Sequence, residues 1–246
     1  MRSLEAHTDL AVTVFVLIHS PLVGPLTWKS LAEEFRRRGV NAIAPALPHA
    51  IDVGPPYWKG HADALAGAAE LTPEEGAIVL VGHSGAGMLL PAVRQALGRT
   101  VSGYIFVDAD IPQDGKSRLD LFESRDDRES FRRAAPEGML PTWTEEDLEE
   151  TIPNPVLRKR FVAGLRPLPL AVYEEPIPVF NGWPDAPCGY LQFTEFYESS
   201  AQHARQEGWP HTQIEADHFH MLVDPRAVAD SLLDLVREMR GDHAPG

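Results

Sequence analysis

The chain has a single cysteine, Cys188, among its 246 residues. One cysteine excludes an internal disulfide and any metal site that needs several cysteine ligands. Basic residues are also scarce, because 22 lysines and arginines stand against 36 aspartates and glutamates, for a formal net charge of −14. Nucleic acids and anionic membranes attract positive surfaces, so this balance argues against either as a partner. It leaves a small molecule as the expected partner and says nothing of the oligomeric state.

Long apolar runs are missing as well. The run over residues 11–18 is too short to cross a membrane, and it lacks the basic start and small-residue cleavage site of a signal peptide. We interpret it as a strand and expect a soluble, cytoplasmic protein. The histidines do not have the spacing of a metal motif, and no Gly-X-Gly-X-X-Gly loop opens the first strand. We therefore expect neither a metal nor a cofactor.

What the chain does contain is an alternation of strand-like and helix-like segments. Apolar, β-branched runs predict strands over residues 11–18, 40–44, 77–81 and 101–107, with helices over 26–38, 58–70 and 86–97. Strands that alternate with helices pair in parallel through right-handed crossovers. Hydrophobic residues make up 43% of the chain, enough for a sizeable core. The pattern predicts one α/β domain with a mostly parallel, doubly wound sheet.

The alternation stops after residue 110. Residues 112–187 are charged and rich in proline, with helical patches over 119–134, 145–151 and 156–165 and no evident strand. An insertion of this length in an α/β frame usually covers a pocket. We predict a mainly helical cap over residues 112–187 and a core formed by 1–111 and 188–246. The core resumes with strands over 190–193 and 212–215 and helices over 195–206 and 224–240.

The most informative residue is Ser84, in the sequence GHSGAG over residues 82–87 at the end of an apolar strand. A sharp turn from strand to helix lifts one side chain clear of the backbone. It also places that side chain near a helix N-terminus, whose free N–H groups favour anionic intermediates. We therefore expect Ser84 to be a nucleophile. A capping serine in an ordinary glycine-rich turn is the simpler alternative.

A serine hydroxyl needs a base to attack an acyl carbon, and the base needs an acid to orient it. His218 is our candidate base because it follows the last predicted strand, at the sheet edge where the serine emerges; His220 is the alternative. Asp108 is our candidate acid because it ends the strand that follows the nucleophile's helix. Asp110 and Glu195 remain alternatives at the same edge.

The order Ser, Asp, His along a doubly wound sheet is that of the α/β-hydrolase superfamily, which the chain resembles over nearly its whole length. Residues 19–21 stand where that family has its oxyanion loop, 82–86 where it has its nucleophile elbow, and 217–219 where it has its histidine loop. Asp108 matches the acid position that some members use. The chain resembles the small-cap members related to hydroxynitrile lyases and methyl esterases, and also actinobacterial members from natural-product pathways.

The chain departs from the family pattern at three positions. Ala86 replaces the second glycine of the elbow, where only a small residue is required. Ser20 replaces a glycine of the oxyanion loop, and Pro21 falls where the family supplies an N–H, which proline lacks. Losing one such donor costs about 10²–10³ in rate. We expect Gly85 to supply one donor and Leu22, or the Ser20 hydroxyl, to supply the second.

The resemblance implies a cofactor-independent serine hydrolase, an esterase or thioesterase for a small, largely apolar substrate, acting through Ser84, His218 and Asp108. The residues expected to line its pocket are His19, Ser20, Pro21, His83, Trp183 and Phe219. Two alternatives stay open. One is a lyase, isomerase or cyclase that uses the serine and histidine as acid–base groups, which the substitution at Pro21 favours. The other is a receptor that binds a small molecule without chemistry.

Overall fold

The computed structural model describes residues 13–72, 76–122 and 124–241. Within them a six-stranded parallel sheet forms the centre of the molecule, in the order β2-β1-β3-β4-β7-β8. Its strands are β1 Val14–Ile18, β2 Asn41–Ile43, β3 Ile78–Ser84, β4 Val101–Ala109, β7 Cys188–Gln192 and β8 His211–Gln213. The chain runs from β1 outward to β2 and then crosses back to β3. Ligands of open α/β sheets bind beyond the carboxyl ends of the strands at such a reversal.

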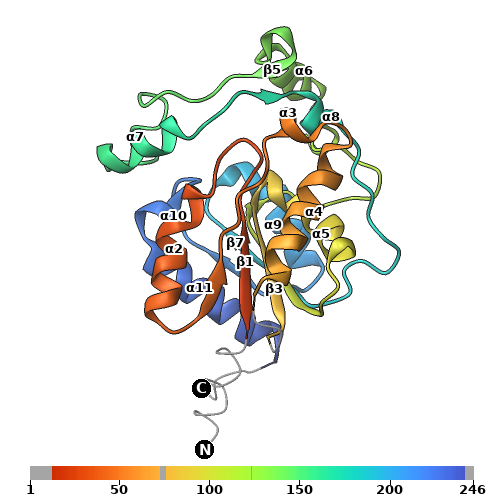
Figure 1. Ribbon diagram of the computed structural model, residues 1–246, viewed down its shortest axis with the longest axis vertical. Coiled ribbons are helices and arrows are strands. Elements are labelled where there is room, and N and C mark those ends of the chain that lie inside the picture. The colour runs from red at the N-terminus through yellow and green to blue at the C-terminus, as the bar shows by residue number, and fades with distance from the viewer. Residues whose placement is uncertain (1–12, 73–75, 123, 242–246) are drawn as a thin grey trace, which may run out of the picture.

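Helices cover both faces of this sheet (Figure 1). On one face lie α2 Leu26–Arg37, α10 His220–Val223 and α11 Pro225–Met239, and on the other lie α4 Tyr57–Glu70, α5 Leu90–Ala96 and α9 Glu198–Gln206. Phe15 and Leu17 of β1 face the first set, whereas Val16 and Ile18 face the second. Each such buried side chain stabilises the fold by about 1.5–3 kcal/mol relative to exposure. The prediction of a doubly wound parallel sheet is confirmed.

The predicted core elements are found with small shifts in their ends. The strand predicted over residues 11–18 is β1 from Val14 onward; positions 11 and 12 lie outside the described residues, as do Glu5 and Asp9, which precede them. The strand predicted to end at residue 81 continues to Ser84, and the helix predicted over 86–97 begins with a 3₁₀ turn, η1 Gly85–Leu89, before α5. A short helix in the loop after β2, α3 Ala50–Val53, was not predicted.

The helices and strands between β4 and β7 lie beyond one end of the sheet, on the side where α3 lies (Figure 1). They are η2 Leu119–Leu121, α6 Arg125–Arg133, η3 Pro136–Gly138, β5 Met139–Leu140, α7 Pro155–Ala163, β6 Leu168–Pro169 and α8 Ala171–Glu174. The expectation of no strand here is wrong, because β5 and β6 pair antiparallel. The helix predicted over 145–151 is wrong too. That stretch forms turns in which Leu148 alone is buried, too little apolar surface to hold a helix against the core.

Hydrogen bonds to Glu175, just after α8, join the segment between β4 and β7 to the core. The carboxylate of Glu175 accepts hydrogen bonds from the backbone N–H groups of Tyr57 (2.8 Å) and Trp58 (2.6 Å), at the N-terminus of α4. A carboxylate at a helix N-terminus satisfies free N–H groups and opposes the positive end of the helix dipole. Within the described parts of the chain, none of the helices combines the length and the apolar character that a membrane crossing requires.

Candidate active site

Ser84 ends β3 in a conformation that few side chains adopt, with φ 58° and ψ −132°. Backbone in this region costs on the order of 1–3 kcal/mol, which the surrounding packing has to offset. The small residues around it make the turn feasible. A β-carbon on Gly82 would lie 3.1 Å from the Ala86 carbonyl, and one on Gly87 would lie 2.1 Å from the Asp110 carbonyl oxygen. The sequence GHSGAG therefore lets η1 fold back against β3 and β4 and present Ser84 beyond the sheet.

Asp108 and His218 are joined at the same sheet edge. Asp108, near the end of β4, is fully buried, and its Oδ2 lies 2.6 Å from Nδ1 of His218. Its carboxylate also accepts hydrogen bonds from the Phe193 N–H (3.0 Å) and from both the N–H and the hydroxyl of Thr194 (2.9 Å each). These four bonds stabilise and orient a carboxylate. Because Nδ1 of His218 donates to it, Nε2 is left as the basic nitrogen.

The alternatives that the sequence left open occupy other places. Asp110 pairs with an arginine, as described below, and the side chain of Glu195 is exposed. His220 opens α10 and packs edge-on against Phe193, with ring centroids 5.7 Å apart. Of the three candidate acids, only Asp108 contacts a candidate base.

The ring of His218 lies between two other rings. The ring centroid of His83 is 4.3 Å from that of His218. The ring centroid of Tyr197 is 5.4 Å from it, and the planes of the Tyr197 and His218 rings are nearly parallel. His83 is fully buried, and its Nε2 donates to the backbone carbonyl of His218 (2.9 Å). Burial lowers the pKa of His83 well below its ordinary value, so it stays neutral and can stack on His218 in either charge state of the latter.

The hydroxyl of Ser84 is paired with a residue that the sequence did not suggest. Its Oγ lies 3.0 Å from Oη of Tyr197, and no hydrogen bond joins Ser84 to His218 among the described residues. Tyr197 ends η4 Glu195–Tyr197, the turn that follows β7. Hydrogen bonds between nucleophile and base are often long without substrate and tighten when it binds. The serine is therefore at the edge that holds the Asp108–His218 pair, but it is hydrogen-bonded to a tyrosine.

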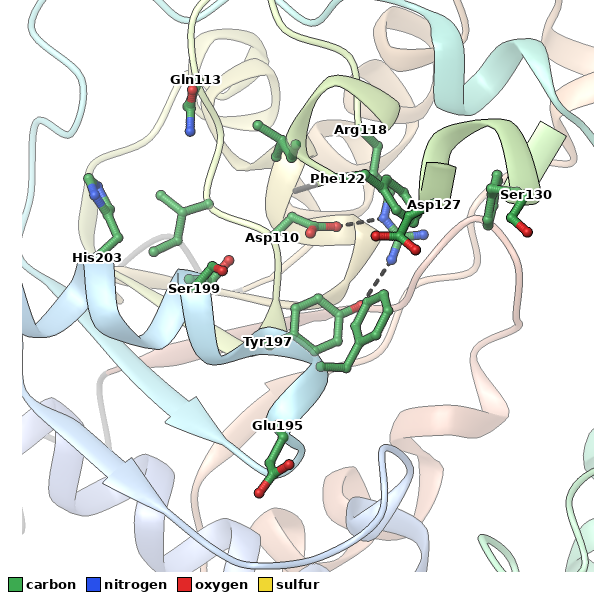
Figure 2. A pocket seen from close by; sticks show the side chains of 15 residues that line it. Asp110, Gln113, Arg118, Phe122, Asp127, Ser130, Glu195, Tyr197, Ser199 and His203 are labelled. Atoms are coloured by element: carbon green, nitrogen blue, oxygen red, sulfur yellow. Dashed lines mark hydrogen bonds and ion pairs between the residues drawn. The ribbon is translucent and has the colours of Figure 1, made fainter. Parts of the chain in front are cut away.

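A largely buried arginine from the inserted segment completes the site (Figure 2). The side chain of Arg118 is 11% exposed; its Nε donates to Oδ2 of Asp110 (2.6 Å) and its Nη2 to Oη of Tyr197 (2.9 Å). Its guanidinium also lies over the ring of Tyr173, 4.6 Å from the centroid. A guanidinium held in three ways has a fixed position. It connects the inserted segment to the hydroxyl that contacts Ser84.

The predicted oxyanion loop lies next to this network, because Ser20 contacts Tyr173. The N–H of Leu22 donates to Oγ of Ser20 at 3.4 Å, and that oxygen lies 3.4 Å from Oη of Tyr173. A β-carbon on Gly85 would lie 3.4 Å from Oγ of Ser20. The Leu22 N–H, predicted as the second oxyanion donor, thus already has an acceptor, although the bond is long.

A cavity of about 800 Å³ opens beside this network. Its lining combines carboxylates, small polar groups and aromatic rings, among them Asp110, Arg118, Phe122, Asp127, Phe131, Glu195, Phe196, Tyr197 and His203. Ser84 and His218 do not line it; Arg118 and Tyr197 stand between the cavity and the serine. Figure 2 shows Glu195 pointing away from the Arg118 network. A much smaller cavity, of about 20 Å³, also has Arg118 in its lining, together with Pro21 and Gly85.

The predicted pocket residues separate into four groups. Ser20 and Pro21 lie beside the nucleophile turn. His19 is buried, which lowers its pKa to about 4, and it accepts a hydrogen bond from the Leu47 N–H. The rings of His83 and Phe219 pack against the ring of His218. Trp183 is not among the residues that line the large cavity. It packs against Tyr104 with centroids 4.4 Å apart, near the start of β4, because its segment returns along the opposite end of the sheet.

Sequence reasoning missed Tyr197, Arg118 and Tyr173. Tyr197 carried a usable signal, since it follows a predicted parallel strand and loops after such strands meet at one edge. Arg118 and Tyr173 belong to the inserted segment, whose path over the sheet has no periodic signature. Among the described residues, no three His, Cys, Asp or Glu side chains are placed to hold a metal ion.

Comparison with solved structures gives the same fold. An extracellular α/β-hydrolase from a Paenibacillus species, described as sharing structural and functional homology with tobacco salicylic acid binding protein 2, is 20% identical, with 91% of this chain and 98% of that one covered and a TM-score of 0.73. Tomato methylketone synthase I bound to 2-tridecanone is 17% identical (92% and 98% covered, TM-score 0.70). A pyrethroid hydrolase from Sphingobium faniae JZ-2 is 16% identical (94% and 99% covered, TM-score 0.69).

Identities this low show a shared fold alone, and a search of curated sequences gave no significant match. The sequence model of the alpha/beta hydrolase family, in contrast, matches residues 15–231, from the first described strand into the last helix. That match includes the strained serine turn and the aspartate–histidine pair at the carboxyl edge of the sheet. The chain is a member of the alpha/beta hydrolase family.

Proposed function

We propose that the protein is a cofactor-independent serine hydrolase that cleaves a small, largely apolar ester or thioester. The observation that carries this proposal is the buried Asp108 carboxylate bonded to Nδ1 of His218, on the strand next to a serine held in a strained turn. The same three residue types in this relation activate serine in acyl transfer on several unrelated folds. The pyrethroid hydrolase of similar fold supports hydrolysis as the reaction class.

The first half of the reaction forms an acyl-enzyme. Oγ of Ser84 attacks the acyl carbon and passes its proton to Nε2 of His218, while the carbonyl π electrons move onto the oxygen. When that carbonyl re-forms, the bond to the alcohol or thiol breaks, and the leaving group takes the proton from His218. Asp108 holds the histidine in the required tautomer and stabilises its cationic form.

The second half releases the acid. Water attacks the acyl carbon and gives a proton to His218, and Ser84 recovers that proton as it leaves. One molecule of ester and one of water thus yield one acid and one alcohol or thiol, with the enzyme unchanged. We propose that residues 112–187 act as a cap that supplies part of the substrate cavity, since Arg118, Phe122 and Phe131 come from it and Phe196 and Tyr197 from the core.

The cavity, which Arg118 and Tyr197 separate from Ser84, supports a small substrate whose apolar part lies away from the acyl carbon. Its volume of about 800 Å³ suits a molecule of drug-like size, and three phenylalanines line it. Phe196 is 68% exposed, so an apolar group at the cavity mouth would contact an aromatic surface already open to solvent.

A non-hydrolytic reaction is the second candidate. The pairing of Ser84 with Tyr197 rather than His218, and the use of the Leu22 N–H by Ser20, favour it. In that case the serine and histidine would move protons without an acyl-enzyme. Trapping an acyl group on Ser84 during turnover would contradict this second candidate.

The proposal is tested by intact-protein mass spectrometry after reaction with a fluorophosphonate, which captures activated serines. We expect one adduct on wild type and none on Ser84→Ala or His218→Ala, followed by turnover in a screen of p-nitrophenyl esters and acyl thioesters. Circular dichroism establishes that the variants are folded. An adduct that persists on Ser84→Ala, or folded wild type that neither reacts nor turns over any ester or thioester, would show that the proposal is wrong.

A further inference from the structure

We propose that Tyr197 is a catalytic residue whose hydroxyl, polarised by Arg118, donates to the acyl oxygen in place of the N–H that Pro21 lacks. The inference rests on the proposed function and adds a residue to it. Tyr197 is the only side chain among the described residues that forms a hydrogen bond with the Ser84 hydroxyl, at 3.0 Å. It therefore contacts the reacting oxygen itself.

The direction of that hydrogen bond depends on where the hydrogen of Ser84 points. A guanidinium has donors and no acceptor, so Arg118 donates to Oη of Tyr197. Either hydroxyl can donate to the other across the 3.0 Å between them. Once Ser84 turns its hydrogen to His218 for the attack, Oγ of Ser84 can only accept from Tyr197, and the tyrosine hydroxyl is left as the donor.

The hydroxyl remains a donor across the working pH range. Burial raises the pKa of Tyr197, and the nearby Arg118 opposes that rise only in part. A hydroxyl that accepts a bond from a guanidinium is a stronger donor to its own acceptor, because the two bonds polarise each other. Arg118 is held by Asp110 and lies over Tyr173, so the polarising charge is fixed before substrate arrives.

During acyl transfer, the hydrogen bond from the Tyr197 hydroxyl can shift from Oγ of Ser84 to the acyl oxygen. When Oγ of Ser84 bonds to the acyl carbon, its lone pair is used, and negative charge develops on an oxygen two bonds away from Oγ. The same hydroxyl can turn to that oxygen, since it already lies against Oγ. Arg118 flanks this space, because a β-carbon on Gly85 would lie 3.5 Å from its Nε. Donors aimed at the developing charge are worth about 10²–10³ in rate each.

The experiment compares Tyr197→Phe with wild type in two assays, the rate constant for fluorophosphonate labelling and the hydrolysis of the best ester or thioester from the screen. We expect labelling and kcat to fall about 10²–10³-fold, with KM changed less than threefold. Arg118 is a positioning residue, so Arg118→Met should lose about tenfold or more in kcat, and Arg118→Lys should recover part of that loss.

Tyr104→Phe is the matched control. Tyr104 is a buried tyrosine whose hydroxyl donates to Asp185, far along β4 from the serine, so its removal should change stability without slowing labelling. A thionoester substrate separates a catalytic role of Tyr197 from a structural one, because a structural defect would slow ester and thionoester alike. Its C=S sulfur is a weak acceptor, so the loss on Tyr197→Phe should shrink.

The outcomes separate this inference from the proposed function. If wild type labels at Ser84 and Tyr197→Phe keeps its rate, the inference is overturned and the hydrolase proposal stands. An equal loss for ester and thionoester overturns it as well, because a structural effect would explain it. If folded wild type neither labels nor turns over, both are overturned together.

Discussion

At the scale of single residues, the role of each polar side chain depends on which of its atoms already has a hydrogen-bond partner. The Asp108 carboxylate receives four hydrogen bonds, so its charge and orientation are set before any substrate binds. His218 donates through Nδ1, which leaves Nε2 as the base. Tyr197 receives a bond from Arg118, and its hydroxyl lies 3.0 Å from that of Ser84. These assignments decide the roles of the side chains more firmly than their proximity does.

At this scale we predict that Asp108→Asn lowers the rate of labelling at Ser84 by about 10⁴. An amide that donates toward His218 would favour the wrong tautomer of the ring, while leaving the volume unchanged. The measurement is the second-order rate constant with the fluorophosphonate. Asp185→Asn, which alters a carboxylate bonded to Tyr104, is the control. A wild-type rate in Asp108→Asn would remove Asp108 from the proposed mechanism.

At the scale of elements, the 3₁₀ turn η1 packs closely against the ends of two strands. It crosses over the ends of β3 and β4, and Gly87 brings its backbone against the carbonyl of Asp110. The strained φ of Ser84 and the positive φ of Asp108 (42°) occur at this crossing. Two strands therefore end in unusual backbone at the place where the proposed nucleophile and acid meet.

A pair of glycine substitutions tests this picture. Gly87→Ala would place a β-carbon 2.1 Å from a backbone oxygen, so η1 or the end of β4 has to move. We predict a loss of about 1–3 kcal/mol in the free energy of unfolding, together with slower labelling. Gly67→Ala lies on the exposed side of α4 with nothing within 4 Å, and it should stabilise by about 0.5–1 kcal/mol. Urea titrations measure both, and equal effects at the two sites would refute the crowding argument.

At the scale of the whole molecule, three buried histidines couple stability to pH. Burial lowers the pKa of His19 to about 4 and also lowers the pKa of His61 and His83. Each has a pKa near 6.5 in the unfolded chain and a lower pKa in the folded protein. Between those pH values the unfolded state holds more protons, so stability rises with pH.

We therefore predict that the protein loses stability as pH falls below about 6.5, by up to about 1.4 kcal/mol per pH unit for each histidine that stays neutral in the folded protein; for His19 this continues to about pH 4. Urea unfolding at pH 7.5, 6.5 and 5.5 measures the slope. His19→Asn should reduce the slope, and the exposed His203→Gln should leave it unchanged. A flat profile between pH 7.5 and 5.5 would contradict the prediction.

The periodic parts of the sequence determined the parallel sheet and the helices on its faces. Continuous apolar runs have few ways to be buried, and strands that alternate with helices have one common handedness. The same order of elements placed Ser84, Asp108 and His218 at one edge, because the carboxyl ends of parallel strands meet there. Local sequence was enough for these features, since each depends on neighbours along the chain.

Only the tertiary structure decided what surrounds Ser84. The path of the inserted segment depends on long-range contacts such as Glu175 with the start of α4, which no periodicity encodes. That path brings Arg118 to Tyr197, sends Trp183 to the opposite end of the sheet and leaves residues 145–151 without a helix. A buried guanidinium is stable only where several distant groups meet it at once, so its place is a property of the folded chain.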